Sequence, residues 1–250
     1  MKVTILGSGT NLHPRRAAAG YLVQTSQPFL IDFGPRTLMN LLKIGINRHR
    51  IQHLLFTHYH ADHFSDFITF FFDAVCHARY VRNRPDLTVI GPKGTKKLFR
   101  SIFKTFPAFD KPPFQVILKE VDTRSFTIGT TRITPRPMTH TDQQTCLGYR
   151  VEHRGRCFAY SGDACYSSNL VRLCRDVDLA ILDCSFPSNR PGAAHMHAGD
   201  CGKVAEEAGV KHLMLSHFYP VAERYDVKKQ AAHIFRGKIS LARDLMSLNW

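Results

Sequence analysis

The chain alternates short apolar runs with polar turns over its first third, a pattern typical of strands. Such runs occupy residues 3–6, 21–25, 29–32 and 53–56. After Pro35, leucine and isoleucine recur at helical spacing, which predicts a helix there. Further helices are expected at about 65–79 and 93–106, on either side of a strand at 88–91.

The rest of the chain continues this mixture of strands and helices. Apolar and alternating runs predict strands at 115–121, 125–128, 131–135, 148–152, 157–160, 179–182, 212–215 and 239–242. Helices are expected at 199–208 and near 221–235. No repeat, low-complexity tract or linker divides the sequence, so one domain over 1–250 is predicted. Two similar halves, with strands before helices, favour an α/β sandwich with the helices outside two sheets.

Composition excludes several classes of protein. Apolar residues make up 44% and charged residues 22% of the 250 residues, which is ordinary globular usage and excludes a disordered or fibrous chain. The most apolar stretch, 64–75, contains two aspartates and is too short to span a bilayer. The first seven residues read as a strand and lack a signal-peptide pattern, and seven irregularly spaced cysteines suit free thiols. We therefore expect a cytoplasmic protein with no membrane partner.

The chain is strongly basic, with 34 Lys and Arg against 20 Asp and Glu and a net charge of +14. Such a charge is compatible with a polyanionic partner, although many small soluble proteins are simply basic. Solvated faces explain most basic runs, but together these could follow a phosphate backbone. The basic residues gather at Arg15 and Arg16, at 48–50, along 93–104, and at Arg79, Arg82 and Arg84.

Fourteen histidines are about twice ordinary usage and direct attention to metal or acid–base chemistry. The sequence Thr-His-Tyr-His-Ala-Asp-His at 57–63 directly follows an apolar strand. If this is a tight turn at the end of the strand, alternation points the side chains of His58 and His60 in the same direction. The side chains of Asp62 and His63 would then lie on the opposite side of the same cleft. This supplies two nitrogens to one cation and an oxygen and a nitrogen to a second, a mixture that suits Zn²⁺.

With these residues the chain resembles the metallo-β-lactamase fold superfamily, and within it the ribonuclease Z group of phosphodiesterases. The similarity covers essentially the whole chain and implies a four-layer αββα sandwich of the α/β class. It also rests on Leu-Ile-Asp-Phe-Gly at 30–34, Thr-His at 139–140, Tyr-Ser-Gly-Asp at 160–163, Ser-His at 216–217 and His-Ala-Gly-Asp at 197–200.

The resemblance implies a dinuclear metal site. One ion would be held by His58, His60 and His140. The second would be held by Asp62, His63 and His217, with Asp163 bridging the two. Zn²⁺ is the expected metal at both positions, while Mn²⁺ or Fe could occupy the same nitrogen and oxygen ligands.

The resemblance also implies catalytic roles. Asp62 is expected to orient the attacking water, and His197 is expected to protonate the leaving oxygen. Asp183 is the candidate partner of His197, although ribonuclease Z proteins usually carry His-Glu-Ala-Thr at that segment. The plainer alternative is that Asp183 caps a strand end and that His195 and His197 are surface residues.

The expected activity is metal-dependent hydrolysis of phosphodiester bonds, in RNA or in a small or cyclic phosphodiester. Many ribonuclease Z proteins insert a tRNA-grasping arm between the fourth metal histidine and the bridging aspartate, but here only the 22 residues 141–162 intervene. The alternative is a hydrolase of a lactone, thioester or sulfate ester on the same fold, and a third possibility is a binding protein that has lost catalysis. The resemblance also makes a homodimer possible.

Overall fold

The computed structural model describes residues 1–11, 13–81 and 84–249. Of the basic residues singled out above, Arg82 lies outside the described residues. None of the described helices is both long and apolar enough to cross a membrane.

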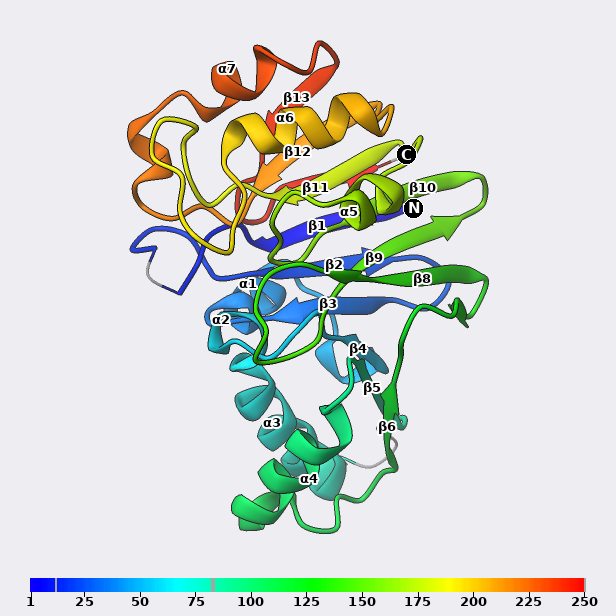
Figure 1. Cartoon of the computed structure of the whole chain (residues 1–250). Coiled ribbons are helices and arrows are strands. Elements are labelled where there is room, and N and C mark those ends of the chain that lie inside the picture. Colours follow the sequence, from blue (N-terminus) through cyan, green and yellow to red (C-terminus); the bar gives the residue numbers. More distant parts are fainter. Residues whose placement is uncertain (12, 82–83, 250) are drawn as a thin grey trace.

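Two sheets of seven strands form the centre of the molecule (Figure 1). The first contains β1 (Lys2–Gly7), β2 (Gly20–Gln24), β3 (Phe29–Phe33), β4 (His53–Leu55), β5 (Leu87–Gly91), β6 (Val116–Glu120) and β14 (Ser247–Asn249). The second contains β7 (Phe126–Ile128), β8 (Thr131–Met138), β9 (Cys146–His153), β10 (Arg156–Tyr160), β11 (Leu179–Asp183), β12 (His212–Ser216) and β13 (Lys238–Leu241). Their orders are β14-β1-β2-β3-β4-β5-β6 and β13-β12-β11-β10-β9-β8-β7.

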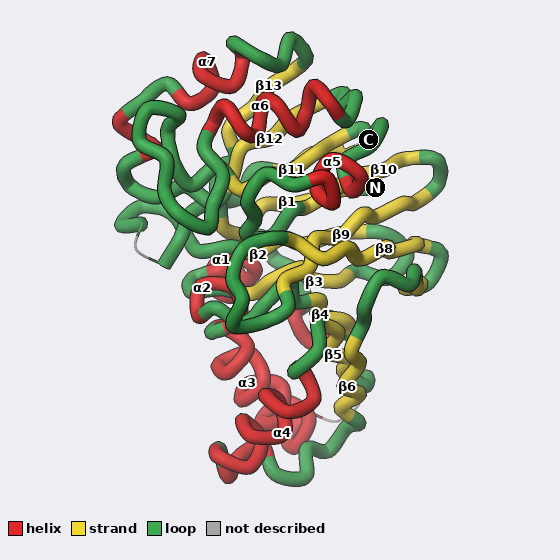
Figure 2. The backbone as a smooth tube through the Cα atoms, viewed as in Figure 1, coloured by secondary structure: helices red, strands yellow, loops and turns green. Residues whose placement is uncertain are grey.

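Helices cover the outer faces of both sheets, as Figure 2 shows. The helices are α1 (Thr37–Lys43), α2 (Ala61–Phe64), α3 (Asp66–Val81), α4 (Thr95–Thr105), α5 (Ser168–Leu173), α6 (Ala198–Glu207) and α7 (Val227–Ala232). Three short 3-10 helices are η1 (Arg48–Arg50), η2 (Pro107–Phe109) and η3 (Ala222–Arg224).

Three apolar layers hold these elements together. One lies between the sheets, where the rings of Tyr21 and Tyr160 meet with centroids 4.5 Å apart. A second packs the first sheet against α1, α3 and α4, and a third packs the second sheet against α5, α6 and α7. This burial on both faces of each sheet confirms the predicted four-layer αββα sandwich.

Strand direction decides where the functional loops lie. β3 and β4 are parallel, and so are β10, β11 and β12. β8 and β10 both pair antiparallel with β9, so they run in the same direction. Within each sheet the carboxyl ends of these strands therefore meet at one edge, which is where ligands bind in open α/β sheets.

Near its C-terminal end the structure differs from the sequence-based expectations in two ways. The helix expected near 221–235 is interrupted at Tyr225, whose backbone is extended, and Asp226 then caps α7 by accepting a bond from the Lys229 N–H at 2.9 Å. The last strand, β14, was not expected, because its three residues carry little apolar pattern and are fixed only by pairing with β1.

Candidate metal centre

The turn after β4 is held in place by the buried carboxylate of Asp32. The backbone N–H and the hydroxyl of Thr57 each donate to Asp32 at 2.8 Å. His60 has extended backbone and begins α2, whose first turn carries Asp62 and His63. Glycine at position 34 is needed because a Cβ there would overlap the carbonyl oxygen of Asp62. These local contacts hold the four ligand side chains of the turn against the sheet edge.

Three imidazoles from two elements converge at one position. His58 Nε2 lies 3.0 Å from His60 Nδ1, which lies 3.2 Å from His140 Nε2. Asp163 Oδ2 lies 3.6 Å from both His58 Nε2 and His140 Nε2. The turn after β4, the loop after β8 and the loop after β10 thus supply one set of four ligand atoms.

A second set lies on the other side of the same carboxylate. Asp163 Oδ1 lies 3.0 Å from His63 Nε2 and 3.2 Å from His217 Nε2. His217 Nε2 is also 3.5 Å from Asp62 Oδ2, and the two imidazole nitrogens are 3.3 Å apart. The structure therefore brings together all seven side chains that the sequence predicts as ligands, with Asp163 between the two sets.

The residues fit a pair of metal ions. Four ligands at zinc bond lengths occupy tetrahedron corners about 3.3 Å apart, close to the spacings found here. Asp163 Oδ1 is buried and accepts no hydrogen bond among the described residues, although burying such an oxygen unpaired is costly. A cation at each set would satisfy this oxygen and remove the repulsion between ring nitrogens that face one another. The arrangement is that of a dinuclear metal site.

Hydrogen bonds behind the ligands set the tautomer of four histidines. Nδ1 of His63 donates to Asp32 at 2.8 Å, and Nδ1 of His140 donates to the carbonyl of Ala194 at 2.6 Å. His58 donates to the Thr57 hydroxyl at 3.0 Å, and His217 donates to the Ser185 hydroxyl at 3.1 Å. Each Nδ1–H is thereby used, which leaves Nε2 with its lone pair aimed at the metal position.

Asp32 is a functional residue to which the sequence analysis gave no role. It is fully buried and also accepts a bond from the Tyr160 hydroxyl at 2.9 Å. Two metal histidines depend on it, His63 directly and His58 through Thr57. The available signal was a charged residue among the four apolar residues of the strand at 29–33, a position that is rarely buried without a partner.

Burial and charge act in opposite directions on the titration of the cluster. Burial lowers the pKa of His58 and of His60, which favours the neutral imidazole that binds metals. Burial alone would raise the pKa of Asp163, but His217 and His63 outweigh it and hold that pKa well below its usual range. Asp163 is therefore ionised and available as a bridge.

The structure corrects the predicted pairing of Asp183. His195, not His197, is its partner, with His195 Nδ1 2.8 Å from Asp183 Oδ2 and 4.0 Å from Asp163 Oδ2. His197 is the N-cap of α6, where its Nδ1 accepts a bond from the Asp200 N–H at 3.2 Å. The alternative that both histidines are surface residues is wrong for His195, which belongs to the cluster around Asp163.

The reason for this correction is local backbone geometry. The residue at an N-cap turns its side chain back onto its own helix, so the imidazole of His197 is hydrogen-bonded to the first turn of α6. His195 lies two residues earlier, in the loop that crosses the sheet edge. In the structure, His197 and Asp200, three residues apart, form a capping box at the start of α6.

Asp183, like Asp32, accepts several hydrogen bonds. Its Oδ1 accepts from the Ser185 N–H at 3.1 Å and hydroxyl at 2.6 Å, and its Oδ2 accepts from the Ala164 N–H at 3.2 Å. Burial lowers the pKa of His195, but the hydrogen bond and charge of Asp183 outweigh this and raise it above its usual value. His195 therefore keeps its proton to higher pH than a free histidine.

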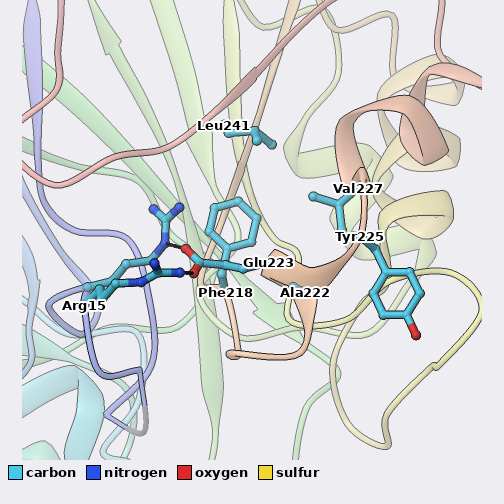
Figure 3. A pocket seen from close by; sticks show the side chains of 8 residues that line it. Arg15, Phe218, Ala222, Glu223, Tyr225, Val227 and Leu241 are labelled. Atoms are coloured by element: carbon cyan, nitrogen blue, oxygen red, sulfur yellow. Dashed lines mark hydrogen bonds and ion pairs between the residues drawn. The ribbon is translucent and has the colours of Figure 1, made fainter.

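A cavity of about 390 Å³ has in its wall Phe218, the residue that follows the ligand His217 in the sequence (Figure 3). Arg15 and Arg16 also line it, and both pair with Glu223, Arg16 Nε at 2.7 Å. Figure 3 shows the Arg15 guanidinium against this carboxylate. None of the seven metal ligands lines the cavity, and its two arginines share the carboxylate of Glu223.

Residues 28–218 match the model of the family described as "Beta-lactamase superfamily domain". The chain is 30% identical to the uncharacterized protein Rv1339 of Mycobacterium tuberculosis, over 96% of this chain and 88% of that protein. It is 28% identical to ribonuclease Z of Mycolicibacterium gilvum, over 98% and 94%. The crystal structure of the metallo-β-lactamase fold protein YhfI from Bacillus subtilis superposes with a TM-score of 0.87 at 24% identity, over 99% and 98%.

We predict that Asp163→Ala abolishes binding of both ions, because each set of ligands loses one of the two oxygens of this carboxylate. Metal content measured by mass spectrometry should fall from about two ions per chain to fewer than one. Asp142→Ala removes an exposed carboxylate close to the site and should leave the metal content unchanged. Two ions retained by the Asp163 variant would contradict the bridging role.

Proposed function

The chain belongs to the metallo-β-lactamase superfamily, and from that premise we propose that it is a hydrolase of phosphodiester bonds that works with two zinc ions. The observation that carries the proposal is the pair His195–Asp183, 2.8 Å apart, beside the carboxylate that bridges the two ligand sets. An alkoxide leaving group is a strong base, so its departure needs a proton donor next to the metal centre.

Zinc is proposed because one ligand set has three imidazole nitrogens and a carboxylate, and the other has two imidazole nitrogens and two carboxylates, all of them donors that Zn²⁺ accepts. Two such ions, when bound, polarise a phosphoryl oxygen and make a water acidic enough to attack at neutral pH. Mn²⁺ and Fe accept the same donors, and metal analysis of the purified protein distinguishes them.

The residues of the chain then have distinct tasks. Asp62 places one oxygen near His217 Nε2, at 3.5 Å, and its other oxygen can accept a bond from the attacking water. Asp183 holds Nδ1 of His195, so the Nε2 proton of the imidazolium is free for the leaving oxygen. Asp32, Ser185 and the Ala194 carbonyl keep the ligand rings in place during the reaction.

The segment between His140 and Asp163 is short, and its length limits which substrates the protein can bind. Its residues form β9, β10 and short turns, and no arm extends from this segment. We therefore propose a small or cyclic phosphodiester, or an RNA that needs no such arm, as substrate. Among the alternatives, a thioester would need the proton donor less, because a thiolate is a weaker base than an alkoxide. A lactone also releases an alkoxide, so the substrate assay has to distinguish it.

The substrate class is tested with the zinc-loaded protein. We expect turnover of bis-p-nitrophenyl phosphate and no turnover of a simple lactone. A 3′-extended tRNA tests the RNA branch, and cleavage at the discriminator base would identify a tRNA-processing enzyme. Lactone hydrolysis without any phosphodiester turnover would exclude the proposal in favour of the alternative.

The acid role is tested by comparing two histidines two residues apart. His195→Ala should lower kcat about 10²- to 10⁴-fold on a phosphodiester with an alkyl leaving group, while metal content stays at two ions. The loss should be smaller with p-nitrophenolate, which leaves without a proton. His197→Ala is the matched control: it should keep activity and lose only about 1 kcal/mol of stability, through the lost cap. Equal losses for both variants would contradict the assignment.

The pH dependence follows from the raised pKa of His195. Activity requires the protonated imidazole, so it should be present below this pKa and lost as the pH rises through it. Asp183→Asn removes the negative charge that raises the pKa, so the alkaline limb of the kcat profile should move to lower pH. An alkaline limb that does not move would show that another group sets it.

A further inference from the structure

The basic residues of the chain fall into two kinds. Arg15 and Arg16 share Glu223, and Arg48 pairs with Asp73 at 2.6 Å. The cations of α4 differ: Lys96, Lys97, Arg100 and Lys104 are exposed, and none forms an ion pair with any described residue. Positive charge left without partners on one element is what a polyanion can bind.

Two adjoining cavities lie along α4 and β6. One, of about 630 Å³, is lined by Arg100, Phe103, Lys104, Pro107, Phe109, Asp110, Lys111 and Pro112. The other, of about 460 Å³, is lined by Lys96, Arg100, Phe103, Pro112, Phe114, Val116 and Leu118. Because they share Arg100, Phe103 and Pro112, they form one groove, which we call the α4–β6 groove.

We propose that the α4–β6 groove is a docking surface for single-stranded nucleic acid. The inference is independent of the proposed activity, because it concerns binding at a surface that contains none of the metal ligands. Four cations line the groove against one carboxylate, Asp110. Figure 1 shows α4 at the lower end of the molecule, far from α7.

The spacing of the cations suits a phosphate backbone. Lys96, Arg100 and Lys104 recur every four residues, so they lie on one face of α4 about 6 Å apart along its axis. That repeat is comparable to the distance between successive phosphates of an extended strand. Lys111 adds a fourth cation at the far end of the groove.

The floor of the groove suits bases. Phe103 and Pro112 lie in both cavities, and Phe103 is only partly buried within the aromatic cluster of α3 and α4. Aromatic floors between cationic rims are how proteins hold single strands without reading their sequence. A flat anionic membrane would contact a convex basic face more readily than this concave one.

The start of α4 also contacts the metal-binding turn. The hydroxyl of Tyr59, which lies between the ligands His58 and His60, hydrogen-bonds Thr95 at the start of α4. A strand bound along α4 with one end at Lys96 would therefore be directed toward the metal-binding turn.

Binding is measured by fluorescence anisotropy with a labelled 15-nucleotide oligouridylate and the zinc-loaded His195→Ala chain, and a gel verifies that the RNA stays intact. The test variant is K96E/R100E/K104E. The control, K228E/K229E/R236E, makes the same charge change at exposed cations near α7. We expect the test variant to lose at least tenfold in affinity and the control less than threefold. Losing three phosphate contacts should also reduce the slope of log affinity against log salt by about 2.

Two further measurements complete the test. Phe103→Leu keeps an apolar side chain but removes the ring, and should weaken RNA binding about fivefold or more while unfolding at a similar temperature. With the native His195, the triple α4 variant should turn over bis-p-nitrophenyl phosphate as the unmodified protein does. Equal losses for both triple variants, or groove-dependent binding to phosphatidylserine vesicles without RNA binding, would overturn the proposal. Absence of phosphodiester turnover in every variant would instead contradict only the proposed activity.

Discussion

The structure depends on one buried carboxylate that lies within 3.0–3.6 Å of four imidazole nitrogens. Asp163 follows β10 in the second sheet, whereas His58 and His63 follow β4 in the first. The two sheets must therefore pack face to face in one register for either ligand set to exist. Ring nitrogens that face each other repel unless protons or cations lie between them, so bound ions would stabilise this convergence.

Two other carboxylates, Asp32 and Asp183, give the cluster its rigidity. Each is buried and fully hydrogen-bonded, and each receives bonds from one histidine directly and from another through a hydroxyl. Such second-layer partners orient ligands and raise their basicity. Asp32 serves only the metal histidines, whereas Asp183 serves one metal histidine and His195. A buried carboxylate thus positions metal ligands in the case of Asp32, and a metal ligand together with the proposed proton donor in the case of Asp183.

The arginines and lysines discussed above fall into two groups, those with and those without an ion-pair partner among the described residues. Arg15 and Arg16 share the carboxylate of Glu223, and Arg48 of η1 pairs with Asp73 of α3. The cations of α4 remain unpaired within the described part of the chain and line a groove. A high net charge alone does not distinguish these two situations, because it counts paired and unpaired residues equally.

The sequence by itself determined the alternation of strands and helices and the four candidate ligands of the turn at 57–63, because strand and helix periodicity and the spacing within one turn are local properties. The other three candidate ligands, His140, Asp163 and His217, were predicted only through the resemblance to a known family. The sequence did not determine the break before α7, the addition of β14, or the choice of His195 over His197. Those depend on the path of loops that no periodicity describes and on partners far away in the chain, such as Asp183 and β1. Only the packed sandwich decided which of two neighbouring histidines faces the metal centre and which caps a helix.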